Sequence, residues 1–135
     1  MAALLADHSS LHCCAVFCCA RTGCEHVSTT KIAAAVATVN VGASGDITAS
    51  ADTGDKTLPV NIALCQTDPA TGQCISGIGP SVTTQINGNA TPTFGIFVQC
   101  NGNVPFDPAA NRIFVRFKDG GNVTRGATSV AVRTQ

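Results

Sequence analysis

The sequence contains no tryptophan and no tyrosine, and it has only one methionine and one glutamate. Charged residues make up 12% of the chain and sum to a net charge of zero. A neutral chain has no overall field that would hold nucleic acid or an anionic membrane surface, so we expect no nucleic-acid partner. No apolar run approaches the roughly 18 residues that a membrane-spanning helix requires, so we expect no membrane span either.

Histidine is also missing from most of the chain, because all three histidines precede residue 27. The remainder therefore cannot build a Ser-His or Cys-His pair for nucleophilic catalysis. Its aspartates lie at turn positions, where this residue is common for local reasons. We expect no catalytic residue, no cofactor and no enzymatic activity. Without Trp or Tyr, only Phe97, Phe106 and Phe114 could offer an exposed ring to a sugar.

Composition changes abruptly near residue 32. The histidines and five of the eight cysteines lie before this point, and almost every strand and turn signal lies after it. The leader has Asp7 and His8 where a signal peptide would carry Lys or Arg, so no export signal is evident. We expect residues 1–33 to be an unstructured or spurious extension and residues 34–135 to form one domain.

The extension offers one alternative, a metal site built from Cys14, Cys18, Cys24 and His26. Thiolates and imidazoles are the ligands that zinc prefers, and four of them would order a short segment. Recognised zinc fingers instead use Cys-x2-Cys pairs separated by a folded unit, which this spacing does not match. The two hypotheses differ in one consequence: a spurious extension predicts that truncation before Ile32 changes nothing, whereas a metal site predicts zinc-dependent order.

After residue 34 the chain alternates apolar and polar residues with a period of two, interrupted by turn signals every eight to fifteen residues. Pro59 indicates an edge strand, because proline cannot donate to a β-ladder. The expected strands cover residues 35–41, 46–51, 57–64, 81–87, 93–100, 112–118 and 123–132. Seven short strands in about a hundred residues predict an all-β, immunoglobulin-like antiparallel sandwich.

Cys65 and Cys74 flank a single turn that is opened by Asp68-Pro69 and closed by Gly72. We expect a disulfide between them, and the chain-entropy estimate for a ten-residue loop is about 2.7 kcal/mol. Such a bond favours an oxidising compartment. Cys100 lies on the apolar face of its strand, where we expect a buried thiol that packs as a small hydrophobe.

Charge is distributed unevenly along the domain. Residues 112–133 hold five basic residues and one acidic residue, whereas residues 46–107 hold five aspartates and one lysine. We expect most of these charges to be solvated outer positions, with a basic docking face as the alternative. The outward Phe114 beside arginines is the preferred candidate for self-association. Asp46, Asp52 and Asp55 could in principle attract calcium, since clustered loop carboxylates suit a hard cation.

Three segments carry a family resemblance: NRIFVRFKDGGNVTRGATSVAVR (residues 111–133), ATVNVG (residues 37–42) and LCQTDPATGQC (residues 64–74). They resemble the C-terminal immunoglobulin-like module of large exported bacterial repeat proteins, over about residues 35–135. The resemblance implies a non-catalytic module of a larger bacterial protein that is secreted or held at the cell surface. Its implied partners are neighbouring modules or a surface ligand.

The function expected from the sequence is therefore that of a structural or adhesive β-sandwich module, with residues 1–33 as a spurious start on a fragment. The alternative is a metal-binding protein that uses the N-terminal cysteines and histidine.

Overall fold

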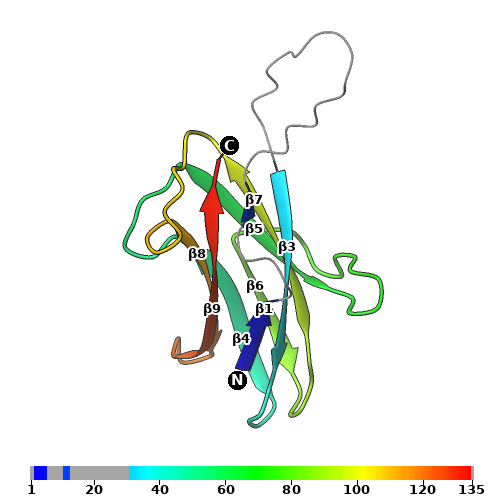
Figure 1. Ribbon diagram of the computed structural model, residues 1–135. Coiled ribbons are helices and arrows are strands. Elements are labelled where there is room, and N and C mark those ends of the chain that lie inside the picture. The colour runs from blue at the N-terminus through cyan, green and yellow to red at the C-terminus, as the bar shows by residue number, and fades with distance from the viewer. Residues whose placement is uncertain (1, 6–10, 13–30, 135) are drawn as a thin grey trace.

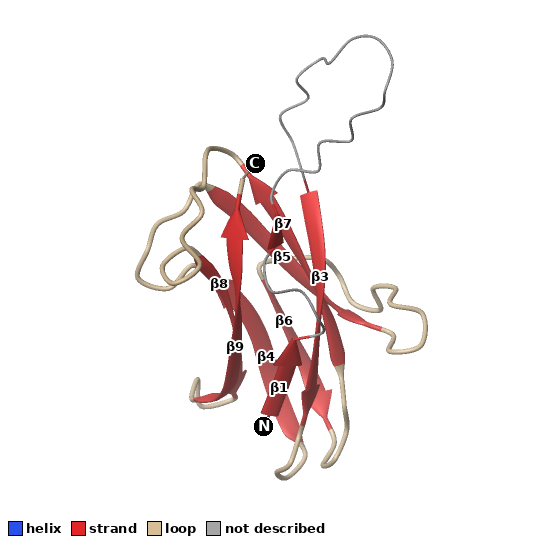
Figure 2. Ribbon diagram, in the orientation of Figure 1, coloured by secondary structure: helices blue, strands red, loops and turns tan. Residues whose placement is uncertain are grey.

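The computed structural model describes residues 2–5, 11–12 and 31–134. Its described residues form strands and loops without a helix (Figure 2). The strands are β1 (Ala2–Leu5), β2 (Leu11–His12), β3 (Lys31–Val39), β4 (Gly45–Asp52), β5 (Val60–Thr67), β6 (Ser81–Ile86), β7 (Thr93–Cys100), β8 (Arg112–Asp119) and β9 (Thr124–Arg133). No helix in this part of the chain is long and apolar enough to cross a bilayer.

The strands form two sheets that face each other across one core (Figure 1). The four-stranded sheet has the order β1-β3-β7-β5, and the five-stranded sheet has the order β2-β9-β8-β4-β6. Every pair is antiparallel except β2 with β9, which run parallel. The predicted all-β antiparallel sandwich is therefore confirmed, and each of the seven predicted strands is present as β3 to β9.

The order of strands within each sheet corresponds to that of an immunoglobulin variable-type domain. Two of these strands, however, occur in the opposite order along the chain. Strands β3, β7 and β5 occupy the places of B, E and D, and β9, β8, β4 and β6 occupy those of G, F, C and C′. In that fold C′ precedes D along the chain, but here β5 precedes β6. The chain therefore crosses between sheets at each of the connections β4–β5, β5–β6 and β6–β7.

The core is formed by the inward residues of both sheets. The alternation on β7 and β8 is regular, because every second residue of each strand is buried. Phe94 and Phe117 meet at the centre with their ring centroids 5.5 Å apart and their planes tilted by 52°. The fully buried side chains include Val36, Leu64, Ile96, Val98, Val104, Ile113, Val115 and Val132.

The inward side of β3 and of the residue that follows it is partly polar. Val36 is buried, but Val41 is 69% exposed, and the buried positions after Val36 are the polar residues Thr38 and Asn40. The Asn40 side chain is satisfied locally, since its Nδ2 donates to the carbonyl of Ala43 at 2.9 Å and its Oδ1 accepts from the Gly42 amide at 3.0 Å. Asn40 thereby fixes the connection from β3 to β4.

Turn chemistry follows the sequence in part. Gly72 has φ of 71° and Gly54 has φ of 65°, as the turn signals around them predict. In the Asn87-Gly88-Asn89 and Asp119-to-Asn122 turns, however, the positive φ falls on Asn89 (62°) and Asn122 (63°) rather than on the glycines. Asparagine tolerates this region because its short polar side chain can bond locally.

The N-terminal residues that the structure describes are paired. Ala2–Leu5 lie antiparallel to β3, and Leu11–His12 lie parallel to β9. These six residues form short strands, and most of the extension expected over residues 1–33 lies outside the described residues. The domain also begins three residues earlier than predicted, since β3 starts at Lys31.

Candidate functional site

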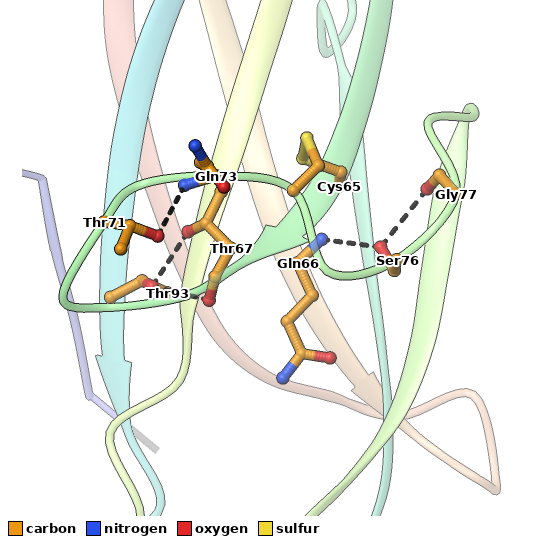
Figure 3. The surroundings of a disulfide bond; sticks show 9 residues. Cys65, Gln66, Thr67, Thr71, Gln73, Ser76, Gly77 and Thr93 are labelled. Atoms are coloured by element: carbon orange, nitrogen blue, oxygen red, sulfur yellow. Dashed lines mark hydrogen bonds between the residues drawn. A yellow bond between two sulfur atoms is a disulfide. The ribbon is translucent and has the colours of Figure 1, made fainter.

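The predicted disulfide between Cys65 and Cys74 is confirmed, with the two Cα atoms 5.7 Å apart. Cys65 is fully buried on β5, whereas Cys74 is exposed on the loop that leaves the strand. The bond therefore ties an exposed segment to a strand of the four-stranded sheet. Figure 3 shows the residues around it.

The loop inside the disulfide is a compact turn. The Asp68 amide donates to the carbonyl of Gln73 and the Gly72 amide donates to the carbonyl of Asp68, both at 2.8 Å. The Asp68 carboxylate accepts from the amides of Ala70 and Thr71 at 2.7 and 3.0 Å. These two hydrogen bonds lower the pKa of Asp68 below its ordinary value. The aspartate thus has a local structural role.

After Cys74 the chain runs along the outer edge of β5. The Ile75 amide donates to the carbonyl of Gln66, and the Gln66 amide donates to the hydroxyl of Ser76, both at 2.8 Å (Figure 3). Leu64 and Gly79 exchange two backbone hydrogen bonds. The edge that Pro59 indicated is confirmed as β5, and residues 75–79 cover part of it, which limits edge-to-edge pairing there.

Beside this loop, the outer face of β5 and β7 carries a hollow of about 260 Å³. Register places Asn61 directly opposite Gln99 and Ala63 directly opposite Phe97. The exposed Ile78 of the loop completes the lining. Among the residues whose side chains the structure describes, none that lines this hollow is charged.

The Phe97 ring extends along its own strand toward Gly95. A Cβ atom placed on Gly95 would lie 3.6 Å from Cζ of Phe97 and 3.6 Å from Sγ of Cys65. Phe97 Cζ and Cys65 Sγ therefore both lie near Gly95, at distances where a Cβ atom would make ordinary van der Waals contact. The Phe97 side chain is partly exposed on the outer face of the sheet and lines the hollow.

On the outer face of the five-stranded sheet, charged side chains form ion pairs with one another. Arg116 of β8 binds Asp52 of β4, with Nε 2.8 Å from Oδ2, and its guanidinium lies 5.2 Å from the centroid of the Phe114 ring. Gly54 packs against the same ring, because a Cβ there would lie 2.8 Å from Cε2. Phe114, the preferred candidate for self-association, is thus engaged within the molecule.

Other basic residues of this face are also bound internally. Arg112 donates from Nη1 to the carbonyl of Pro108 at 2.6 Å and from Nε to the hydroxyl of Ser129 at 3.0 Å. Arg125 pairs with Asp119 at 2.6 Å. A docking face for an acidic partner would have to compete with these contacts, so the interpretation as outer-surface charges agrees better with the geometry.

The three carboxylates proposed for calcium, Asp46, Asp52 and Asp55, do not converge on one point. Asp46 and Asp52 lie near opposite ends of β4, six residues and about 20 Å apart. Arg116 holds the pKa of Asp52 below its ordinary value, chiefly through its hydrogen bond, so this carboxylate is already engaged. Among the described residues, no three Cys, His, Asp or Glu side chains converge on a point where they could hold a metal ion.

A larger hollow, of about 480 Å³, lies at the connection between β3 and β4. Asp119 lines it, but this carboxylate accepts from the amides of Gly121 and Val123 at 2.9 and 3.0 Å as well as from Arg125. The hydrogen bonds from Val123 and then from Arg125 lower its pKa. This hollow is therefore lined by charged residues, Asp46, Asp119 and Arg125, whereas the described residues that line the one beside Phe97 are uncharged.

The four metal candidates, Cys14, Cys18, Cys24 and His26, lie outside the described residues. The interpretation of Cys100 as a free thiol is wrong, because Cys100 is disulfide-bonded. Its burial on the core face agrees with expectation. Apolar alternation identified where the side chain points, but it carries no information on a bond to a distant cysteine.

Comparison of the chain with known protein families, with curated protein sequences and with solved structures finds no match. The class that the geometry itself defines is a disulfide-bonded all-β sandwich.

Proposed function

We propose that this chain is a non-catalytic structural or adhesive β-sandwich module of a larger secreted or surface protein, and that its work is to present a binding surface. The observation that carries the proposal is the disulfide between Cys65 and Cys74, which holds an exposed loop beside an uncharged hollow of the four-stranded sheet. A surface fixed in this way is pre-organised, and pre-organisation lowers the entropic cost of binding.

The distribution of apolar side chains supports the same choice of surface. Ile75 and Ile78 are each 62% exposed on the loop that the disulfide secures. Ile78 also lines the hollow, and exposed apolar side chains gathered at a concave site favour an interaction surface. The opposite face, by contrast, has its principal charged groups, Arg116 and Arg125, engaged in ion pairs.

The oxidising compartment is supported by the cysteines. Cys65, Cys74 and Cys100 are all in disulfides, and disulfides persist mainly in secreted and cell-surface proteins. The placement in a bacterial surface protein rests on the resemblance of residues 35–135 to exported repeat modules. Partners implied by that resemblance are adjacent modules or a ligand on another surface.

The non-catalytic part of the proposal is supported by the state of the carboxylates. Asp52, Asp68 and Asp119 each have a lowered pKa, and each accepts hydrogen bonds from turn amides or an arginine. A general acid needs a pKa raised toward neutrality. These three groups are shifted in the opposite direction and serve as structural acceptors.

Adhesion of the full chain tests the proposal. Beads coated with the oxidised chain would be passed over surfaces of mucin, polysaccharide and extracellular matrix glycoprotein, and retention under flow would be measured. We expect retention above that of uncoated beads on at least one surface. Beads that carry Cys65→Ala/Cys74→Ala should lose it, because the loop is no longer secured. Retention equal to that of uncoated beads on every surface would overturn the adhesive role.

A further inference from the structure

The hollow on the outer face of β5 and β7 combines two kinds of side chain in a small area. Phe97 and Ile78 supply apolar surface, together with the small side chain of Ala63. Asn61 and Gln99 supply side-chain amides. The amides lie directly opposite one another, two residues along each strand from the directly opposed Ala63 and Phe97. One end of the hollow is therefore apolar and the other is polar.

The amides are available for a ligand. Neither the Asn61 nor the Gln99 side chain forms a hydrogen bond within the part of the chain that the structure describes. Each carries two N–H donors and one carbonyl acceptor. A ligand whose groups both donate and accept would satisfy this pair, and hydroxyl groups have that property.

The ring supplies the complementary contact. Phe97 is partly buried on the outer face of β7, and its ring forms an apolar wall of the hollow. The C–H face of a pyranose ring packs on such a wall, while its hydroxyls, at the ring edge, would reach Asn61 and Gln99. An aromatic side chain also loses little conformational entropy on binding, since only two dihedral angles define it.

From this geometry we propose that the hollow binds one ring of a neutral saccharide. The inference rests on the proposed adhesive function, and it names the ligand class of that surface. Its volume of about 260 Å³ is slightly below the roughly 300–1,000 Å³ typical of sites for drug-sized ligands, which suits a single ring. The described residues that line the hollow carry no charge, which suits a neutral ligand.

A titration of the full, oxidised chain with neutral disaccharides tests this. Cellobiose, maltose and lactose would be added to the ¹⁵N-labelled protein, with amide and side-chain shifts followed by NMR. We expect saturable shifts centred on Asn61, Phe97 and Gln99, with Kd in the millimolar range that a single ring in an open hollow allows. No saturable shift with any of the three sugars would overturn the inference.

Variants with matched controls separate the site from the rest of the surface. Phe97→Leu keeps apolar volume on the sheet but removes the ring, and it should weaken binding about 10-fold. Gln99→Ala should weaken it about 3-fold to 10-fold, since one hydrogen-bond partner is lost. Phe106→Ala and Gln85→Ala remove an exposed ring and an exposed amide elsewhere, and they should change Kd less than about 2-fold.

Two outcomes would contradict the inference. Sugar binding that survives both Phe97→Leu and Gln99→Ala would place the site elsewhere. The same shifts on raising the protein concentration without sugar would assign the face to a second copy of the chain. Neither result affects the adhesion assay: beads that are retained equally with and without Phe97→Leu would leave the adhesive function standing and refute only the saccharide site.

Discussion

Removal of the Cys65–Cys74 bond is the most direct test of how this domain is held together. The double variant Cys65→Ala/Cys74→Ala opens a ten-residue loop, for which the chain-entropy estimate is about 2.7 kcal/mol. For a domain of about a hundred residues, 1 kcal/mol corresponds to roughly 4–8 °C in Tm. We therefore expect Tm to fall by about 10–20 °C.

The assay is thermal unfolding followed by circular dichroism, at one protein concentration and without reductant. A reducing agent would confuse the result, because Cys100 is also disulfide-bonded. Gln73→Ala is the control, since it alters an exposed side chain inside the same loop and leaves the bond intact. Its Tm should move by less than about 3 °C.

Amide hydrogen exchange locates the effect. The amides of Ile75 and Gly79 donate to β5, and this pairing depends on the loop staying against the strand. Both should exchange faster in the double variant, while core amides keep their protection relative to the new global stability. A fall in Tm below about 3 °C, with unchanged exchange at Ile75 and Gly79, would show that hydrogen bonds alone secure the loop. The entropic reasoning would then be refuted.

Three further variants probe the sandwich itself. Phe117→Ala should cost about 3–5 kcal/mol, measured by urea unfolding, because the ring is fully buried and leaves a cavity. Gly54→Ala should lower Tm, because its φ of 65° and the 2.8 Å approach to the Phe114 ring leave no room for a methyl group. Asp52→Asn should reduce the loss of Tm on acidification. Arg116 depresses the folded pKa of Asp52, so this contribution is full above the unfolded value of 3.8 and is lost as pH falls through the lower folded pKa.

The sequence predicted the strands well where alternation and turn signals agree. β7 and β8 alternate regularly between bounding turns, and their limits were predicted to within one residue. Strand β3 was harder, because its run of alanines does not distinguish the two faces of the strand. The sequence does not predict that β5 joins the four-stranded sheet and β6 the five-stranded sheet, because this assignment depends on pairings between strands far apart in sequence.

The candidate site was predictable only in its covalent part. The spacing of Cys65 and Cys74 around one turn indicated their bond, and the bond is present. The hollow depends on register, because only the pairing of β5 with β7 places Asn61 opposite Gln99. Phe97 was one of three candidate exposed rings, and nothing in the sequence distinguished it from Phe114, which is covered by Gly54 and Arg116.

The paired N-terminal residues bear on whether residues 1–33 are dispensable. Ala2–Leu5 cover the edge of β3 and Leu11–His12 cover the end of β9, so they shield one side of each sheet. Unpaired edges invite association with another chain. Truncation before Ile32 should therefore expose the edges of β3 and β9. A truncated chain that stays monomeric, with unchanged Tm, would show instead that the extension adds nothing to the fold, as composition alone suggests.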